Sequence, residues 1–367
     1  MPPLSSLTAT HSPSTGVATF SALPSPGELT AELPAAPGAI AAVERGRTGI
    51  RAILNGLDNR LLVIAGPCSI HDPEAGLDYA ARLAEAARRH SADLLVVMRT
   101  YFEKPRTTVG WKGLINDPHL DGSHDVAAGL RTARRFLLDV TALGLPVATE
   151  FLEPVSAPYL ADLVSWGAIG ARTTESQIHR QLAAGLPLPV GFKNGTDGGI
   201  QVAVDACLAA SAEQAYLGMD DDGRAAVVAA PGNPDAHLIL RGGSGGPNYS
   251  ADSVLDASRQ LAAAGVNPRV IVDASHANSG KSHHRQAEVA LELAAQLEAA
   301  GTGALAGVML ESFLTGGAQK LDVAEVARGE AELVYGRSVT DACMGWETTE
   351  LVLEQLAAAS RAAAGQS

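Results

Sequence analysis

The stretch Leu61-Leu62-Val63-Ile64-Ala65-Gly66-Pro67-Cys68 is the first of eight short apolar runs that each end on or just before a polar or charged residue. It shows no alternation of apolar and polar residues, which is typical of a parallel strand covered on both faces. The other seven runs span residues 94–98, 146–149, 168–171, 189–192, 237–240, 270–272 and 307–310. The residues that follow the eight runs are Cys68, Arg99, Glu150, Arg172, Lys193, Arg241, Asp273 with His276, and Glu311. Because the strands of a (β/α)8 barrel all end at one pocket, the pattern predicts that these side chains share a site.

The segments between the runs have helical patterns, so strands and helices alternate along the chain. Helices are predicted over residues 39–57, 74–89, 125–142, 158–165, 176–183, 251–263, 284–299 and 348–364. Alternating strands and helices are typical of a parallel sheet, and eight such units favour a closed barrel. No G-x-G-x-x-G motif follows an early strand, which argues against an open dinucleotide-binding sheet. We therefore predict an α/β fold, a (β/α)8 TIM barrel.

The barrel is expected to be a catalytic domain over residues 61–367, preceded by an N-terminal helical extension over 38–60. Residues 1–37 are rich in Pro, Ala and Ser, which predicts a disordered tail without chemistry of its own. Two connections are longer than the roughly 12–15 residues of ordinary loops. Residues 100–123 are expected to cover the pocket, and residues 195–236 contain a predicted β-hairpin insertion, 215–229, between the fifth and sixth strands.

Composition excludes several classes of function. The chain has 367 residues and a formal net charge of −13 at pH 7, which argues against nonspecific binding to nucleic acid or to a membrane surface. No apolar run approaches the roughly 20 residues of a membrane helix. The three cysteines do not form a disulfide framework, and a cytoplasmic location is expected. The first forty-four residues contain no Lys or Arg, so they lack the charged start of a signal peptide.

Four residues of metal-ligating type lie at or after strand ends: Cys68, His276, Glu311 and Asp341. A thiolate, an imidazole and two carboxylates suit one divalent transition ion (Mn, Fe, Co or Zn) better than Ca or Mg. The alternative for a single Cys after a strand is a buried structural thiol, which is the more frequent case. The joint position of all four at the mouth of one barrel favours the metal site.

A set of basic residues surrounds the same predicted pocket: Arg99, Lys104, Arg106, Arg172, Lys193 and Arg241. Six cations in one pocket would repel one another without a bound anion, and guanidinium groups match phosphate and carboxylate. Glycine-rich stretches at 195–199 and 242–246 allow backbone amides to approach a phosphate. The alternative is that each base pairs with a surface acid. Two anionic substrates, at least one of them phosphorylated, are the interpretation we favour.

Longer motifs carry a resemblance to a known family. They are GPCSIHD at 66–72, RTYFEKPRTT at 99–108, GARTTES at 170–176, GFKNGTDG at 191–198, LRGG at 240–243, SHANS at 275–279 and TDAC at 340–343. In this order they resemble type I 3-deoxy-D-arabino-heptulosonate-7-phosphate (DAHP) synthases, from about residue 39 to residue 358. The Lys104-Pro105-Arg106-Thr107 element is similar to the erythrose 4-phosphate branch rather than to the 3-deoxy-octulosonate 8-phosphate synthases.

The resemblance implies a reaction and a role for each matching residue. The expected substrates are phosphoenolpyruvate and erythrose 4-phosphate, and the expected assembly is a homodimer or homotetramer. Cys68, His276, Glu311 and Asp341 would hold the metal. Arg99, Arg172, Lys193 and Arg241 would bind phosphoenolpyruvate, and Ala171 would be a further substrate-binding residue. Lys104 would lie between the two substrates, Arg106 and Thr107 would bind the erythrose 4-phosphate phosphate, and Glu150 would orient a water or a basic side chain. Lys104, His276, Cys68 and Asp341 are the predicted catalytic residues.

Two departures from the family bear on regulation. The hairpin that binds aromatic amino acids in inhibited members has an acidic turn here, Asp220-Asp221-Asp222, and Pro187 replaces a small polar residue. We therefore expect weak or absent inhibition by aromatic amino acids.

Two alternatives to the DAHP synthase hypothesis remain: the same chemistry on another aldose phosphate in a secondary pathway, and a catalytically silent partner of another enzyme.

Overall fold

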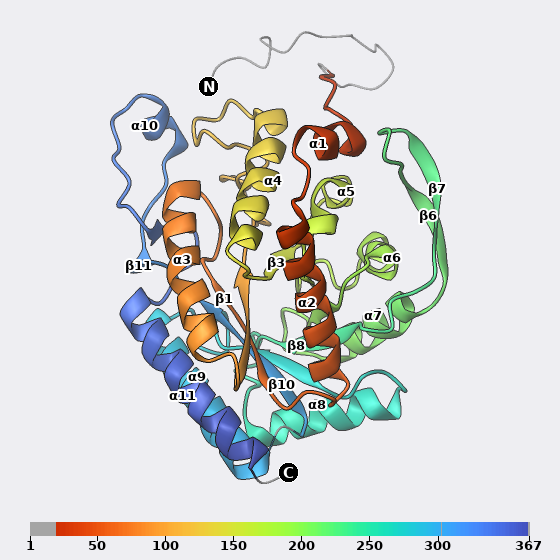
Figure 1. The fold of residues 1–367 in the computed structure, drawn as a ribbon, viewed down its shortest axis with the longest axis vertical. Coiled ribbons are helices and arrows are strands. Elements are labelled where there is room, and N and C mark those ends of the chain that lie inside the picture. Colours follow the sequence, from red (N-terminus) through yellow and green to blue (C-terminus); the bar gives the residue numbers. More distant parts are fainter. Residues whose placement is uncertain (1–19, 302, 366–367) are drawn as a thin grey trace.

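The computed structural model describes residues 20–301 and 303–365, and its centre is a closed barrel of eight parallel strands (Figure 1). Around the barrel the strands follow the order β1-β10-β9-β8-β5-β4-β3-β2. Their bounds are β1 Leu61–Gly66, β2 Leu94–Arg99, β3 Val147–Glu150, β4 Trp166–Ile169, β5 Val190–Lys193, β8 His237–Leu240, β9 Val270–Asp273 and β10 Leu305–Glu311. The predicted TIM barrel is confirmed. The fourth strand was predicted two residues late, because Trp166 and Gly167 belong to the strand and Gly170 to the turn that follows it.

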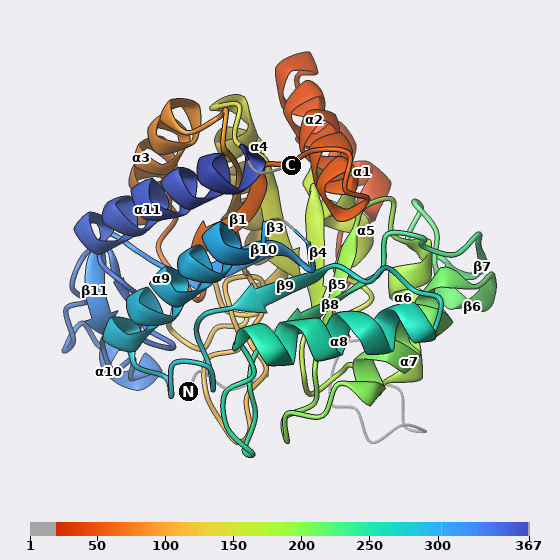
Figure 2. The same cartoon turned by 90° about the horizontal axis from the view of Figure 1, so that it is seen from below.

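Helices alternate with these strands around the outside of the barrel (Figures 1 and 2). They are α3 Pro73–Arg89, α4 Val126–Ala142, α5 Ala157–Leu160, α6 Gln177–Gly185, α7 Gln201–Ser211, α8 Ala251–Ala263, α9 His283–Ala300 and α11 Trp346–Ala364, with a short α10 Val323–Ala327. Local chemistry sets the starts: Asp72 accepts hydrogen bonds from the backbone of Glu74 and Ala75, and Pro73 occupies the first turn of α3. Within the described ranges, no helix is both long and apolar enough to cross a bilayer.

The insertion between the fifth and sixth barrel strands contains more structure than predicted. The hairpin is present as β6 Gln214–Met219 paired antiparallel with β7 Ala225–Ala230. It contacts α6 and lies at the edge of the molecule in both views (Figures 1 and 2). Helix α7, which precedes it, was not predicted; its sequence QVAVDACLAAS has no sharp division between apolar and polar faces. The hairpin prediction is therefore confirmed, and α7 is an addition.

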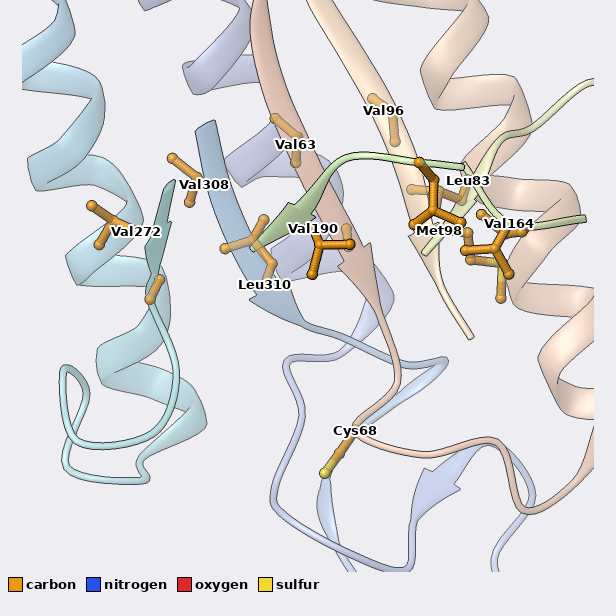
Figure 3. Close-up of a cluster of buried hydrophobic side chains, with 14 of the residues drawn as sticks. Val63, Cys68, Leu83, Val96, Met98, Val164, Val190, Val272, Val308 and Leu310 are labelled. Atoms are coloured by element: carbon orange, nitrogen blue, oxygen red, sulfur yellow. The ribbon is translucent and has the colours of Figure 1, made fainter. Parts of the chain in front are cut away.

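The core has two layers. One lies between the strands and the surrounding helices, and Figure 3 shows part of it, including Val63 of β1 and its partner Val308 on the neighbouring strand β10. The other fills the barrel interior and includes Ile50, Ile53 and Leu54 of α2 Pro37–Leu54. The loop before β9 holds the end of α2, because Asn267 Nδ2 donates to the Leu54 carbonyl at 3.0 Å. Helix α2 therefore closes the N-terminal end of the barrel.

The N-terminal segment corrects the predicted disordered tail over residues 1–37. Residues 1–19 lie outside the described residues, but Pro26–Glu32 forms helix α1 with a capping box between Ser25 and Glu28. Leu29 is fully buried, and the Gly27 amide donates to the Asp221 carbonyl of the hairpin at 2.8 Å. The prediction is wrong for residues 26–37, because the Pro- and Ser-rich composition here supplies helix-start residues rather than disorder.

A buried histidine inside the barrel makes stability depend on pH. His237 Nε2 accepts from the Trp166 indole at 3.1 Å, its Nδ1 lies 2.8 Å from the Asp235 carbonyl, and burial lowers its pKa to about 4. An unfolded histidine titrates near 6.5. Between pH 6.5 and pH 4 this histidine therefore binds a proton in the unfolded chain but stays neutral in the folded chain. We expect this residue to remove about 3 kcal/mol of unfolding free energy over that window, and nothing above it.

Urea unfolding at several pH values tests this expectation. His237→Gln should reduce the slope of unfolding free energy against pH between 4 and 6.5 by up to about 1.4 kcal/mol per pH unit. Trp166→Phe, which removes the indole donor and keeps the histidine, is the control and should retain most of the slope. An unchanged slope in His237→Gln would contradict the assignment.

Candidate metal centre and anion pocket

Three of the four predicted metal ligands meet at the mouth of the barrel. Sγ of Cys68 and carboxylate oxygens of Glu311 and Asp341 all lie within 4.8 Å of one another. Strands β1 and β10 align Gly66 with Glu311, which brings Cys68, just past the end of β1, beside this carboxylate (Figure 3). His276 lies at the edge of this group, with Nε2 4.0 Å from Glu311 Oε1.

The charges around Cys68 favour a bound cation. Burial, and next the Glu311 carboxylate, raises the pKa of the Cys68 thiol. Lys104 Nζ lies 3.2 Å from Cys68 Sγ, and the backbone amide of Cys68 donates to Cys343 Sγ at 3.3 Å. A thiolate is the form that ligates metal, and here it would be stable only beside added positive charge. A thiol, two carboxylates and an adjacent imidazole make a donor set that fits a divalent transition ion.

A cavity of about 290 Å³ adjoins this cluster. Its lining includes ten of the predicted site residues: Lys104, Arg106, Thr107, Glu150, Ala171, Arg172, Lys193, Arg241, His276 and Asp341. The volume is close to the roughly 300 Å³ lower end for small-molecule sites. A larger cavity of about 870 Å³ lies between α2, α3 and the start of β2. Its lining, drawn from the described residues, includes none of the predicted site residues, so the smaller cavity is the candidate site.

Arg99 lies beside the metal cluster and is not among the residues that line the cavity. Its side chain is fully buried beside the metal cluster, with Nη2 3.1 Å from Glu311 Oε1 and the guanidinium 4.0 Å above the Tyr101 ring. Arg99 thus forms a buried ion pair with Glu311. The other predicted basic residues line the cavity.

Glu150, at the end of β3, is a buried carboxylate between bases. Burial alone would raise its pKa, but the nearby Lys193 and Lys104 ammonium groups outweigh burial and lower it. Gly170 lies against it: a Cβ at this position would be 2.2 Å from Glu150 Oε1. The carboxylate is thus ionised and tightly confined at the wall of the cavity.

The loop after β2 reaches over the cavity, as predicted. Residues 104–109 contribute to the lining, and Arg172 Nη2 donates to Thr107 Oγ1 at 3.3 Å. At the base of the loop, Ser156 Oγ donates to Glu103 Oε2 at 2.9 Å, and burial raises the pKa of Glu103 to about 7. Arg106 and Thr107 are exposed, so the outer part of the pocket is open to solvent.

One residue of the site was missed by prediction, and another was predicted without a role. Lys281, the missed residue, lines the cavity near His276 and adopts a left-handed backbone with φ 63°, held by its amide donating to the His276 carbonyl at 2.7 Å. Asp273, predicted at the pocket from its strand-end position alone, is fully buried between His276 and Lys193. The signal for Lys281 was its position shortly after the SHANS motif.

Fold and site together define a (β/α)8 barrel protein in which a cluster of residues that could hold a metal ion lies beside a cavity lined by basic side chains. The family model described as the DAHP synthetase I family matches residues 35–354, and the chain belongs to this family. A phospho-2-dehydro-3-deoxyheptonate aldolase of Corynebacterium glutamicum is 56% identical over 346 residues, covering 94% of this chain and 93% of the relative. A Phe-sensitive aldolase of the same name from Escherichia coli K12 is 52% identical over 93% of this chain and 95% of its own.

A solved structure agrees with the barrel. That of phospho-2-dehydro-3-deoxyheptonate aldolase from Francisella tularensis SCHU S4 superposes with a TM-score of 0.90 at 44% sequence identity. The match covers 94% of this chain and 99% of the other.

Proposed function

We propose that the protein is a 3-deoxy-7-phosphoheptulonate synthase, which condenses phosphoenolpyruvate with D-erythrose 4-phosphate and water to give DAHP and phosphate, the first step of the shikimate pathway. The observation that carries the proposal is the cavity in which Lys104, Arg172, Lys193 and Arg241 meet the cluster of Cys68, Glu311 and Asp341. Such a set can hold two anions beside a divalent ion. Membership of the DAHP synthetase I family supports the same reaction.

The residues suggest a division of labour. Arg172, Lys193 and Arg241 would hold phosphoenolpyruvate, and Arg106 with Thr107 would hold the phosphate of the aldose. A divalent ion held by Cys68, Glu311, Asp341 and His276 would supply Lewis acidity for the aldehyde. The C3 atom of phosphoenolpyruvate forms the new bond to the aldehyde carbon, water adds at C2, and inorganic phosphate leaves. The bases hold together two anions that water would keep apart, which is proximity with electrostatic preorganisation.

Lys104 is the group best placed to transfer a proton. Although burial alone would lower the pKa of its ammonium, the Cys68 and Glu150 side chains outweigh burial and raise it. Lys104 is therefore protonated at neutral pH, at the boundary between the metal cluster and the anion cavity. It can donate this proton to the alkoxide that forms at the former aldehyde.

Phosphate release from phosphoenolpyruvate tests the proposal directly. The assay is run with erythrose 4-phosphate and with other aldose phosphates, each with and without EDTA. We expect release with erythrose 4-phosphate and its loss with EDTA, restored by Mn²⁺, Fe²⁺, Co²⁺ or Zn²⁺. Preference for another aldose would favour the secondary-pathway alternative, and no release with any aldose would favour a silent partner.

The expected dimer or tetramer can be checked by sedimentation.

We infer that aromatic amino acids inhibit the enzyme weakly or not at all. The inference rests on Pro187, whose carbonyl accepts from Arg51 Nη2 at 3.2 Å, and on the acidic hairpin turn. The relatives give an opposing indication, since one is named Phe-sensitive and a 53% identical one from Enterobacter agglomerans is named Trp-sensitive. Titration with Phe, Tyr and Trp should change the apparent substrate affinity by less than the roughly 5-fold lower end of typical allosteric coupling. Strong inhibition by any of the three would refute the inference.

A further inference from the structure

Asp273 is a buried carboxylate between the metal cluster and the anion pocket. It is the last residue of β9 and fully buried. Its Oδ1 accepts from Ser275 Oγ at 2.5 Å and from the Ser275 amide at 3.0 Å. Its Oδ2 lies 2.9 Å from His276 Nδ1 and 3.4 Å from Lys193 Nζ, without an aligned hydrogen bond to either. One carboxylate thus faces both a predicted metal ligand and a predicted phosphoenolpyruvate base.

The hydrogen bonds around Asp273 determine which nitrogen of His276 carries a proton. Ser275 has a single hydroxyl proton, and it is directed to Asp273 Oδ1. The Ser275 oxygen, 2.7 Å from His276 Nδ1, is then an acceptor for that nitrogen. Asp273 Oδ2 on the other side is an acceptor as well. Two acceptors around Nδ1 require the proton there, which leaves the lone pair of Nε2 on the side of Glu311.

The backbone around His276 keeps the ring in this place. His276 has φ 53°, a left-handed conformation that costs a non-glycine residue energy and persists only where the surroundings impose it. The Lys281 amide closes the turn onto the His276 carbonyl, and Asn278 Nδ2 donates to the Asp273 carbonyl at 2.9 Å. Asp273 and its histidine are therefore held as one unit.

Two basic side chains face the Asp273 carboxylate. Its Oδ2 lies 2.9 Å from His276 Nδ1 and 3.4 Å from Lys193 Nζ. An ionised carboxylate attracts the Lys193 ammonium, which lines the cavity. The same group can thus orient the histidine toward the metal cluster and the lysine at the wall of the anion pocket.

We propose that Asp273 is a positioning residue that holds His276 in the Nδ1-protonated tautomer for metal ligation and anchors Lys193 for phosphoenolpyruvate. The inference rests on the proposed function for the identity of the metal and anion sites. Carboxylate partners of metal-ligating histidines commonly fix the tautomer and orientation of the ring. Asparagine at this position carries no charge, so it would lose the ion pair with Lys193 in either orientation. Where its NH₂ group faces Nδ1, it would also favour the wrong tautomer.

The test measures binding rather than turnover. Affinity for Mn²⁺ is measured by competition with a chromophoric chelator in the substrate-free full chain, and affinity for phosphoenolpyruvate by calorimetry in the metal-free full chain. Asp273→Asn is expected to weaken Mn²⁺ binding roughly 10–100-fold and also to weaken phosphoenolpyruvate binding. Asp93→Asn is the matched control, since Asp93 is a buried acid paired with Arg361 at the other end of the barrel. It should leave both affinities unchanged, whereas unchanged affinities in Asp273→Asn would overturn the proposal.

A spectroscopic measurement keeps the proposal testable if Asp273→Asn does not fold. The ¹⁵N shifts of histidine-labelled, metal-free full chain report which ring nitrogen is protonated, with His276→Gln used to assign the signal. A protonated Nδ1 supports the proposal and a protonated Nε2 overturns it. The outcome is separable from that of the proposed function: a chain that forms no DAHP, but binds Mn²⁺ in an Asp273-dependent way, would refute only the reaction.

Discussion

Cys68→Ser is expected to release the metal ion and abolish turnover. The substitution keeps the size of a fully buried side chain but replaces a thiolate by a hydroxyl that stays protonated at neutral pH. The loss in Mn²⁺ or Zn²⁺ affinity should exceed the roughly 10–100-fold typical of losing an outer partner, because a direct ligand is removed. Metal content after dialysis and phosphate release from phosphoenolpyruvate measure the two effects.

Cys207 provides the matched control for this experiment. It is also a fully buried cysteine, it lies in α7, and burial raises its pKa to about 12, so it remains a thiol. Cys207→Ser should keep both the metal and the activity, with at most a lower melting temperature. If Cys68→Ser retained metal and turnover as the Cys207 variant does, the cluster with Glu311 and Asp341 would not be the metal centre.

Lys104→Ala is expected to lower turnover roughly 10²–10⁴-fold, the range associated with loss of a positioned proton donor. Lys104 Nζ lies 3.2 Å from Cys68 Sγ and lines the anion cavity, so the charge lost is the one between the two sites. The metal content should be retained, because three carboxylate and thiol donors and His276 are unchanged. Single-turnover kinetics with saturating substrates separates this loss from weaker binding.

Lys112→Ala is the control for Lys104, because Lys112 is an exposed lysine of the same loop. Its backbone carbonyl, which accepts from the Lys104 amide at 2.8 Å, is kept in the variant. We expect near-normal turnover from Lys112→Ala. Unchanged turnover in Lys104→Ala, with both substrates bound, would exclude a role for this lysine in proton transfer.

The sequence allowed the barrel to be predicted because each strand is a continuous apolar run, and because only a parallel sheet covered on both faces explains eight of them. The residues at which strands and helices begin and end were harder to predict. The fourth strand begins at Trp166, which packs inside the barrel beside His237, a contact that no local pattern reveals. Helix α1 was missed because its proline and serine are equally compatible with a loop until Leu29 is seen to be buried.

The sequence predicts which residues meet at the candidate site. It does not predict the directions in which their side chains point. A strand-end position brings Arg99 to the mouth of the barrel, and there its guanidinium lies over the Tyr101 ring and against Glu311. Asp273 was predicted at the pocket but without a role, because its contact with Lys193 joins residues far apart in the chain. Such partnerships depend on three-dimensional packing, which the spacing of residues does not encode.

Because helix α2 closes the N-terminal end of the barrel, it limits where substrates and products can enter and leave. The described side chains of the interior layer, from Ile50 to Met309, are at most 2% exposed, so they fill the barrel along its axis. The cavity lies at the opposite end of the barrel from α2 and is lined in part by residues 104–109. The sugar acid and the phosphate of the proposed reaction would therefore leave at the same end of the barrel at which the substrates enter.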